Sequence, residues 1–508
     1  MAQSIPPIDG PSIPPTPPDD TAPMPAPLHL HPDRFLPTDP ARRDIARQLY
    51  ALAAPLPIVS PHGHTDPAWF AINECFTDAA GLLLTPDHYL LRMLYSQGIG
   101  LAALGIHATD GRDVVAAPRE SWRCFASHYH LLRGTPSRIW LDHVFAAVFG
   151  MTVRLDAETA DTYFDTIGAA LATDAFRPRN LLDRFHIECI ATTEGALDPL
   201  PHHQALRAAG WGHRVLTTFR PDDVVDPDRS EFATNLASLA HLTGEATNRW
   251  PGFLAALRAR RAVFRAMGAT ATDHGHPTAR TADLPARQCQ QLLDVCLRGT
   301  ATPAEKELFR AQVLTEMAGM SLDDGLVMQI HAGSQRNHNA QLFARYGRDR
   351  GADIPAPTNY VHALAPLLDR YGNEPALQII LFTLDESAYS RELAPLAGHY
   401  PALKLGPPWW FHDSVEGMLR FRRQTTETTG FYNTVGFNDD TRALLSIPAR
   451  HDLARRVDST YLASLVADHR LHEDEAAELI VELSYTLAKQ AYRLPDAAAP
   501  ARQARTVS

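Results

Sequence analysis

Short apolar runs that alternate with helical patterns constrain the fold of this chain more than any other feature. The runs cover residues 55–60, 187–193, 214–219, 268–273, 326–331, 377–383, 402–406 and 432–437. Each run ends in a polar or Gly/Pro cluster, as buried strands do, and a helical pattern lies between most neighbouring runs. Strands joined in this way form a parallel sheet, and eight of them close a barrel. We therefore predict an α/β fold, a distorted (β/α)8 TIM-type barrel, although the run 268–273 is polar for a barrel strand.

Two helical segments extend this barrel, and two tails flank it. Residues 70–185 are too many for a loop and carry helical patterns, so we predict a large helical insertion after the first strand. We assign residues 29–494 to one barrel domain that ends in closing helices over 451–494. The Pro-rich residues 1–28 and the segment 495–508 are predicted to be disordered. A two-domain, doubly wound sheet is the alternative, but no Gly-rich phosphate loop follows any of the runs.

The composition argues against several classes of protein. The 508 residues carry a formal net charge of −11, whereas a nucleic-acid surface needs concentrated Lys and Arg. The five cysteines are scattered, odd in number and without a CxxC pair, which argues against disulfides and thiolate zinc sites. The opening residues lack a basic segment followed by an apolar run, and no stretch approaches the roughly 20 apolar residues of a membrane span. We therefore expect a cytoplasmic protein with neither a nucleic acid nor a membrane as its partner.

Chemically active side chains follow the runs at the positions where the strands are expected to end. In chain order they are His62 and His64, Glu194 and Asp198, Arg220 and Asp222, Asp273 and His274, His331 and Arg336, Asp385 and Glu386, Trp409 and Trp410, and Asp440 and Arg442. Unrelated turns would hold mostly Ser, Gly, Asn and Pro. Because the carboxyl ends of barrel strands meet at one mouth, we expect a catalytic site there.

His62 and His64 follow the first strand with one residue between them, so alternation in an extended chain places both imidazoles on one face. The first and eighth strands of a closed barrel are neighbours, which brings Asp439 or Asp440 opposite this pair. Two imidazoles and a carboxylate are a competent ligand set for one divalent Zn, Mn or Fe ion. A polar turn with solvated histidines, and a helix-capping role for the aspartates, are the alternatives.

Three arginines, Arg220, Arg336 and Arg442, lie at strand ends of this acidic protein. Guanidinium groups bind carboxylates and phosphates through parallel hydrogen bonds, so these arginines favour an anionic substrate. Ion pairs with Asp222 or Asp440 are the alternative use of the same charges. The indoles of the PPWWF stretch either cap the barrel or contact a sugar ring.

Seven motifs in this order resemble one known family. They are HGH at 62–64, DHYLLRMLYSQGI at 87–99, FRPD at 219–222, DHG at 273–275, HAGSQRN at 331–337, GPPWWFHD at 406–413 and DDTRALLS at 439–446. Through them nearly the whole chain resembles the uronate isomerases of the amidohydrolase superfamily. The resemblance implies a metal-dependent isomerase that interconverts an aldehyde uronic acid and its ketose, D-glucuronate with D-fructuronate or D-galacturonate with D-tagaturonate. It leaves the native metal and the preferred uronate open, and we expect a homo-oligomer.

The resemblance also implies roles for individual residues. The metal ligands are His62, His64 and Asp440; the catalytic residues are Asp440, Tyr89, His88 and Arg442; the substrate-binding residues are Arg220, His331, Arg336, Trp410 and Asp273. Asp440 would remove the hydroxyl proton that starts ring opening. Tyr89, with its pKa lowered by Arg442, would carry a proton from C2 to C1 through an enediol. His88 would steady the enediolate oxygen.

Two departures from the family pattern and two rival functions stay open. Thr441 stands where the family usually has serine, and the turn at 192–198 is less acidic than the family's, which leaves Glu194 undecided, as Asp439 also is. A metal-dependent amidohydrolase on the same barrel is the first rival, but no lysine follows the fourth strand to bridge two metals. A non-catalytic protein that binds sugar acids is the second, but the four expected catalytic residues are all present.

Overall fold

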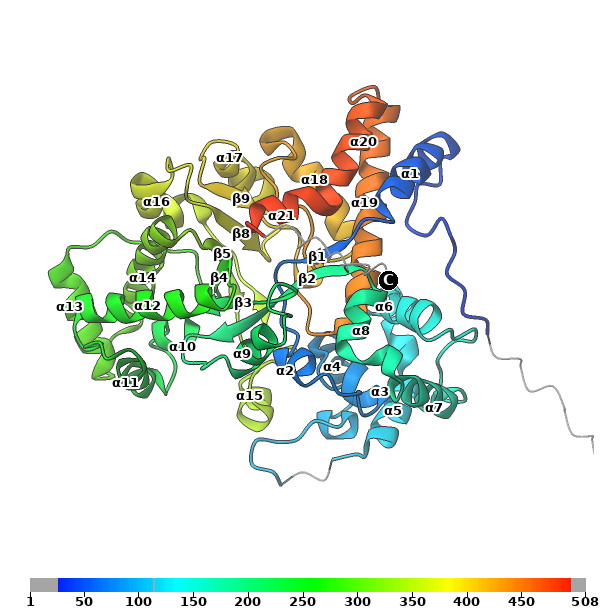
Figure 1. The fold of residues 1–508 in the computed structure, drawn as a ribbon, viewed down its shortest axis with the longest axis horizontal. Helices are drawn as coiled ribbons and strands as arrows, with labels where there is room; N and C mark the ends of the chain where they lie inside the picture. The colour runs from blue at the N-terminus through cyan, green and yellow to red at the C-terminus, as the bar shows by residue number, and fades with distance from the viewer. Residues whose placement is uncertain (1–25, 113–114, 495–508) are drawn as a thin grey trace, which may run out of the picture.

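A curled sheet of seven parallel strands lies at the centre of the molecule (Figure 1). The computed structural model describes residues 26–112 and 115–494. The strands are β1 (Ile58–Ser60), β2 (Ile187–Gly195), β3 (Val215–Arg220), β4 (Ala271–His274), β5 (Val327–Ala332), β8 (Ile379–Thr383) and β9 (Leu403–Leu405). They pair in this order, and a separate antiparallel pair joins β6 (Ser334–Gln335) to β7 (Ile354–Pro355). The predicted α/β, TIM-type architecture is confirmed, and the polar run contributes β4 as predicted.

The predicted eighth strand, 432–437, does not form, and on this point the prediction is wrong. Thr434 makes an isolated parallel bridge with Leu405 of β9. Gly436 then turns the chain with a φ of 72°, a left-handed conformation in which a strand cannot continue. The ladder of the sheet therefore ends at β9, and the chain that would have closed it crosses to the first strand as a loop.

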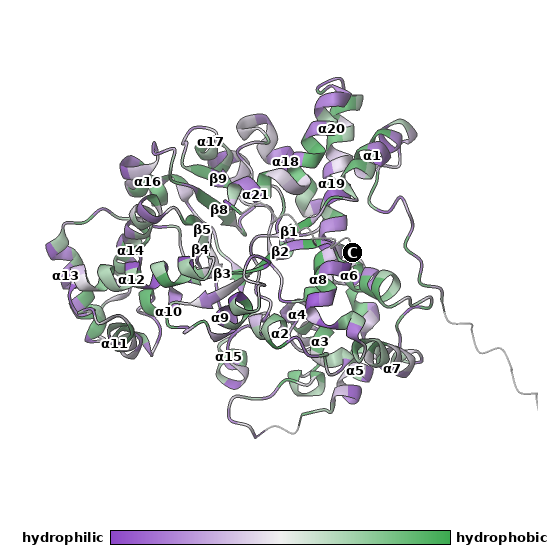
Figure 2. Ribbon diagram, in the orientation of Figure 1, coloured by the Kyte–Doolittle hydropathy of each residue, from purple (hydrophilic) through white to green (hydrophobic). Residues whose placement is uncertain are grey.

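Apolar side chains fill both the inside of the curled sheet and the space between the sheet and the helices. Both faces of the sheet are covered, and every residue of β5 and β8 is buried. The inner cluster includes Val59, Ala191, Leu216, Val327, Ile380 and Phe382. Figure 2 shows the outer helices with alternating hydrophilic and hydrophobic stretches, as expected when one side of a helix faces the core.

Helices surround the sheet, and a large group of them is inserted between β1 and β2 (Figure 1). The inserted helices are α2 (Pro67–Ile72), α3 (Ala79–Leu83), α4 (His88–Ser96), α5 (Pro118–Ser127), α6 (Pro136–His143), α7 (Ala160–Leu171) and α8 (Pro178–Arg184). Those that follow later strands are α9 (Pro201–Ala208), α10 (Asp222–Val225), α11 (Phe232–Thr243), α12 (Trp250–Ala266), α13 (Ala286–Leu297), α14 (Pro303–Asp324), α15 (Ala340–Tyr346), α16 (Tyr360–Tyr371), α17 (Ala394–Ala397) and α18 (Val415–Thr429). The last helices are α19 (Ile447–Ala467), α20 (Glu473–Val481) and α21 (Leu487–Ala491). Of these, α19 and α20 pack against α1 (Pro40–Ala53).

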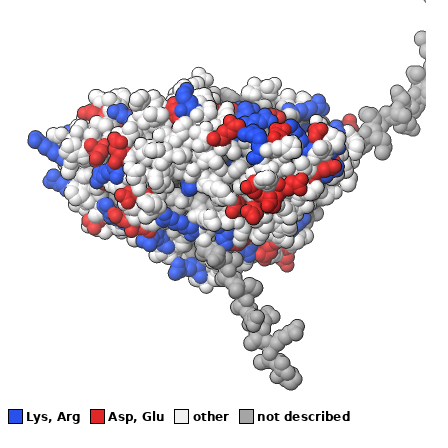
Figure 3. Space-filling model, turned by 90° about the horizontal axis from the view of Figure 1, so that it is seen from above, with Lys and Arg blue, Asp and Glu red and all other residues white. Residues whose placement is uncertain are grey.

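Residues 1–25 and 495–508, which make up most of the two predicted tails, lie outside the described residues. Within the described ranges, no helix combines the length and the apolar character that a bilayer crossing demands. On the face seen in Figure 3, basic and acidic side chains are interspersed, so neither sign of charge covers that face.

Glu194, which the sequence leaves undecided, lies between the sheet and α9. Its Oε2 atom accepts a hydrogen bond from the hydroxyl of Thr217 and is 3.7 Å from Nε2 of His203. Burial raises the pKa of this carboxyl to about 7, because a buried site disfavours the charged form.

Replacement of Glu194 by Gln should stabilise the fold more at about pH 8 than at about pH 5. Below its ordinary pKa of 4.5 the carboxyl is protonated in the folded and unfolded chains alike, and between 4.5 and about 7 only the folded chain keeps the proton. Stability is therefore lost as the pH rises through this window, by about 3 kcal/mol at most. Thermal unfolding midpoints of the variant and the wild type at both pH values measure the difference. The exposed Glu158→Gln variant is the control, and an equal gain at both pH values would contradict the prediction.

Candidate active site

A cavity of about 680 Å³ opens at the carboxyl ends of the strands, and every residue to which the family resemblance assigns a role lines it. These residues are His62, His64, His88, Tyr89, Arg220, Asp273, His331, Arg336, Trp410, Asp440 and Arg442. They come from the ends of the strands, from the loops that follow them and from the first turn of α4. The volume lies in the range of sites that bind small molecules. Five other side chains that the sequence places after strand ends do not line the cavity: Glu194, Asp198, His274, Asp385 and Glu386.

His62, His64 and Asp440 form the first of two groups in the described chain whose positions suit a metal ion. Their ligand atoms lie within 4.8 Å of one another. Oδ1 of Asp440 is 3.1 Å from Nε2 of His64 and 3.5 Å from Nε2 of His62. This buried oxygen has no hydrogen-bond partner among the described residues, which is unusual for a carboxylate. Two imidazoles and an unsatisfied carboxylate oxygen fit a divalent cation.

Local backbone features bring these three side chains together. A Cβ atom at Gly63 would lie 3.3 Å from the carbonyl oxygen of Thr441, so glycine allows the two segments to approach closely. The N–H of His64 donates to that same carbonyl oxygen over 2.9 Å. Asp440 has a φ of 38°, in the left-handed region that residues other than glycine rarely adopt outside functional sites.

The protonation states of these side chains suit metal binding. Burial lowers the pKa of His62 to about 4, so its imidazole is neutral near neutral pH. Burial opposes ionisation of Asp440, but the neighbouring His62 and His64 outweigh it and hold the pKa of the carboxyl well below its ordinary value. The site therefore presents an ionised carboxylate with a neutral imidazole, which are the forms that bind metals.

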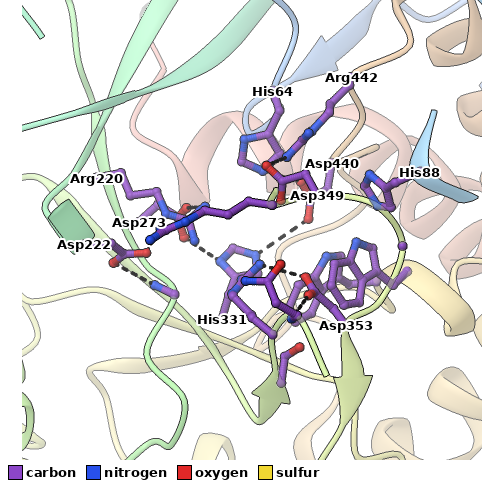
Figure 4. A pocket seen from close by; sticks show the side chains of 18 of the residues that line it. His64, His88, Arg220, Asp222, Asp273, His331, Asp349, Asp353, Asp440 and Arg442 are labelled. Carbon is purple, nitrogen blue, oxygen red and sulfur yellow. Dashed lines mark hydrogen bonds and ion pairs between the residues drawn. The ribbon is translucent and has the colours of Figure 1, made fainter. Parts of the chain in front are cut away.

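His331 lies at the centre of the cavity, between Asp273 and Asp440 (Figure 4). Its Nδ1 atom is 2.7 Å from Oδ1 of Asp273, and its Nε2 atom is 4.0 Å from Oδ2 of Asp440. With His62, Asp273 and His331 form the second group whose ligand atoms lie close enough for a metal. Arg220 approaches Asp273 to 3.0 Å and balances its charge, so the first group is the better ligand set.

A buried chain of hydrogen bonds, which sequence reasoning missed, supports His62. Nε2 of Gln329 is 3.3 Å from Nδ1 of His62. The hydroxyl of Tyr492 donates to Oε1 of Gln329 over 2.9 Å and accepts from the amide of Asn438 over 2.9 Å. Partners of this kind orient a metal-binding imidazole. Tyr492 follows the last helix, α21, and belongs to no sequence motif from which this contact could be predicted.

His88 and Tyr89 begin α4 and face the cavity. The side chain of Asp87 accepts hydrogen bonds from the backbone of Tyr89 and Leu90, and this cap fixes the first turn of the helix. The rings of His88 and Tyr89 stack with 4.7 Å between centroids, and Trp410 meets His88 edge-on at 5.7 Å. Both ring nitrogens of His88 and the hydroxyl of Tyr89 are buried without a hydrogen-bond partner among the described residues. Because buried polar groups are normally paired, these unpaired atoms indicate a position where a ligand binds.

The expectation that Arg442 lowers the pKa of Tyr89 is wrong. Burial raises the pKa of Tyr89 well above its ordinary value of 10.0, and the nearby cation that opposes this rise is Arg450. Arg442 instead pairs with Asp349 over 3.1 Å. Sequence reasoning missed Arg450 because it lies inside a helix, α19, and does not follow a strand.

The other predicted substrate-binding arginines are also held by carboxylates. Arg220 pairs with Asp222 over 2.7 Å, so the ion pair that the sequence left open as an alternative is present. Arg336 lies 3.4 Å from Asp353. These partners orient the guanidinium groups within the cavity wall (Figure 4).

Asp439, the alternative ligand, does not reach the histidine pair. Its Oδ2 atom is 3.0 Å from Nε2 of His451, and its backbone oxygen accepts a hydrogen bond from Arg450 over 2.9 Å. Neither Asp439 nor Glu194 is among the described residues that line the cavity. The geometry therefore favours Asp440 as the third ligand.

This chain is similar to known proteins over most of its length. A sequence model described as glucuronate isomerase matches residues 33–492. The chain is 66% identical over 471 residues to a uronate isomerase of Xanthomonas campestris pv. campestris, a match that covers 93% of this chain and 100% of that protein. The crystal structure of glucuronate isomerase from Caulobacter crescentus superposes with a TM-score of 0.91 at 62% identity, over 94% of this chain and 100% of that one. A uronate isomerase from Thermotoga maritima superposes with a TM-score of 0.85 at 25% identity, over 92% and 100%.

Replacement of Gly275 by Ala should displace Arg220. A Cβ atom at Gly275 would overlap the guanidinium of Arg220 and lie 2.7 Å from Oδ2 of Asp222. Loss of a charge-assisted hydrogen bond costs about 1.5–3 kcal/mol, so KM for an anionic substrate should rise about tenfold or more. Gly168→Ala is the control, because a Cβ atom there meets nothing within 4 Å. An unchanged KM, with Arg220 still in place in a crystal structure of the variant, would disprove this expectation.

Proposed function

The chain belongs to the glucuronate isomerase family, and on that premise we propose that it interconverts a hexuronate aldose and its ketose. Isomerase activity follows from the identity of 66% to a uronate isomerase over 93% of the chain. As reaction pairs we propose D-glucuronate with D-fructuronate and D-galacturonate with D-tagaturonate. One observation carries the finer proposal: the candidate metal ligands share a cavity with the unpaired polar atoms of His88 and Tyr89.

His62, His64 and Asp440 are the residues that we assign to one divalent cation. Two observations support this assignment: the ligand atoms of the three residues lie close together, and one oxygen of Asp440 is unsatisfied. Bound there, the cation supplies a Lewis acid and a template for the carboxylate and hydroxyl oxygens of the sugar. The choice among Zn, Mn and Fe is open, because this ligand set suits each of them.

Asp440 acts as the base for ring opening, since its carboxylate is ionised and lines the cavity. Tyr89 then takes the proton from C2 and returns it at C1, while the hydroxyl proton of O2 passes to O1, so that the C1 aldehyde becomes a hydroxymethyl group and C2 becomes the ketone through an enediol. Burial lowers the pKa of His88 to about 3, and its neutral imidazole donates a hydrogen bond to the enediolate oxygen. The ring nitrogens of His88 and the hydroxyl of Tyr89 are free to meet the substrate because the described chain offers them no hydrogen-bond partner.

The remaining side chains of the cavity wall hold the substrate in place. We assign this role to Arg220, Asp273, His331, Arg336 and Trp410, with Arg442 close to the reacting carbons. Guanidinium groups orient the carboxylate and hydroxyl groups of the sugar through paired hydrogen bonds. An indole face packs against the carbon-bound hydrogens of a sugar.

We also propose that the enzyme is cytoplasmic. All five cysteines are free thiols, which a reducing compartment favours. The homo-oligomer stays a prediction.

Metal-loaded protein incubated with D-glucuronate or D-galacturonate in D₂O should form the ketose, and NMR follows both ketose formation and deuterium exchange. Chelator-treated protein is the control, and activity should return with added Zn, Mn or Fe. Amine or acid released from an amide or ester, with no ketose from either uronate, would establish the hydrolase rival. Uronate binding without either reaction would establish the non-catalytic rival.

Replacement of Tyr89 by Phe should lower kcat about 100- to 10,000-fold, the usual contribution of a general base. The cation content of this variant should equal that of the wild type, because Tyr89 is not among the assigned ligands. His64→Asn is the matched control, and it should lose the cation. Metal analysis and steady-state kinetics measure both effects. Undiminished turnover in the Phe variant would remove Tyr89 from proton transfer.

A further inference from the structure

Arg450 has no role in the reaction described so far, yet it lies beside the proposed proton carrier, Tyr89. It lines the cavity from α19 and is 2% exposed. Its guanidinium carbon is 3.5 Å from the centroid of the Trp140 indole and 5.7 Å from the centroid of the Tyr89 ring. Trp140 in turn meets Tyr89 edge-on with 5.9 Å between centroids. Arg450 and Trp140 therefore form two walls of the space that the phenol ring occupies.

Two anchors fix the guanidinium of Arg450 in this position. Its Nη1 atom donates to Oδ2 of Asp413, which is 2% exposed, and to the backbone oxygen of Asp439 over 2.9 Å. The second bond holds the residue that directly precedes Asp440.

The charges around Tyr89 make this cation necessary for the proposed proton transfer. The phenol of tyrosine ionises little near neutral pH, so little of it is present as the phenolate, which is the base. Burial disfavours the phenolate further. Asp440, Asp413 and Asp87 also oppose the phenolate, and Arg450 is the cation that acts most strongly in its favour. A charge is felt most in such a buried site, where water screens little.

Arg442 does not replace Arg450 in this role. Its side chain is 35% exposed, whereas that of Arg450 is 2% exposed. It is not among the groups that act most strongly on Tyr89.

We propose that Arg450 is a positioning residue of the isomerase: it holds Tyr89 in place and provides the positive charge that makes the phenol hydroxyl competent to move the proton between C2 and C1. The inference rests on the proposed function, in which Tyr89 carries that proton. Arg450 itself touches neither reacting carbon, because it acts through the phenol ring.

Three variants test the inference: Arg450→Met, Arg450→Lys and the double variant Asp413→Asn/Arg450→Met. Arg450→Met leaves the carboxylate of Asp413 buried and unpaired, which can prevent folding. The double variant removes both charges, so it keeps the fold and remains informative if the single variant fails. Arg450→Lys retains a cation at this position.

Loss of the charge should slow proton transfer without weakening the binding of substrate or metal. In Arg450→Met kcat should fall about tenfold or more, the change that one pKa unit brings, while KM and cation content stay within about twofold of wild type. The double variant also removes the carboxylate of Asp413, which opposes the phenolate less strongly than Arg450 favours it, so its kcat should fall less but in the same direction. The isotope effect on kcat with C2-deuterated hexuronate should rise, because cleavage of the C2–H bond becomes limiting. The ascending limb of the kcat–pH profile should move to higher pH, and Arg450→Lys should restore most of kcat.

A second buried ion pair provides the matched control. Arg422 and Asp458 are held by two hydrogen bonds of 2.7 and 2.9 Å and do not line the cavity. The double variant Arg422→Met/Asp458→Asn should leave the isotope effect and the pH profile unchanged. Two outcomes would overturn the inference, provided that the wild type turns over substrate. One is an isotope effect and a pH profile that do not change in the Asp413/Arg450 double variant. The other is a change of equal size in both double variants. A wild type that forms no ketose would overturn the proposed function together with this inference.

Discussion

The contact between the end of the first strand and the chain that returns after β9 is the constraint on which the site depends. His64 donates its backbone N–H to Thr441, and Gly63 permits the close approach. The left-handed backbone of Asp440 then turns its carboxylate onto the two imidazoles. Residues at opposite ends of the sequence become one ligand set because a curled parallel sheet brings its first and last segments together. No ladder of strand pairs holds this contact in the described chain, so a few specific contacts fix the geometry of the candidate metal site.

Burial gives the groups around this contact their chemical character. Polar atoms of His88, Tyr89 and Asp440 lie buried without partners, an arrangement that costs stability and is kept where a ligand will satisfy it. Burial also keeps imidazoles neutral, while pairs of opposite charge, such as Arg442 with Asp349, leave the cavity wall nearly balanced. An anionic substrate therefore enters a site in which each guanidinium already has a defined orientation.

Local patterns in the sequence predicted the parts of this structure that depend on local rules. Position after a strand end was enough to predict that residues such as His62, His64 and His331 share one cavity, whereas His88 and Tyr89 at the start of α4 were predicted only from the family resemblance. Other features depend on tertiary contacts that no local pattern encodes. The left-handed turn at Gly436 replaces the eighth strand. Asp349, which lies far from Arg442 in the sequence, forms an ion pair with it. Arg450 inside a helix and Tyr492 near the chain end reach the site only through packing.

The barrel and its insertion contribute different parts of the chemistry. His62, His64 and Asp440 come from the two ends of the curled sheet, whereas Tyr89 and Trp140 come from α4 and α6 of the inserted helices. In the proposed function, metal binding and proton transfer therefore fall on different segments of the chain. A barrel of this kind can acquire a new reaction by remodelling its inserted helices while its ligand set stays the same.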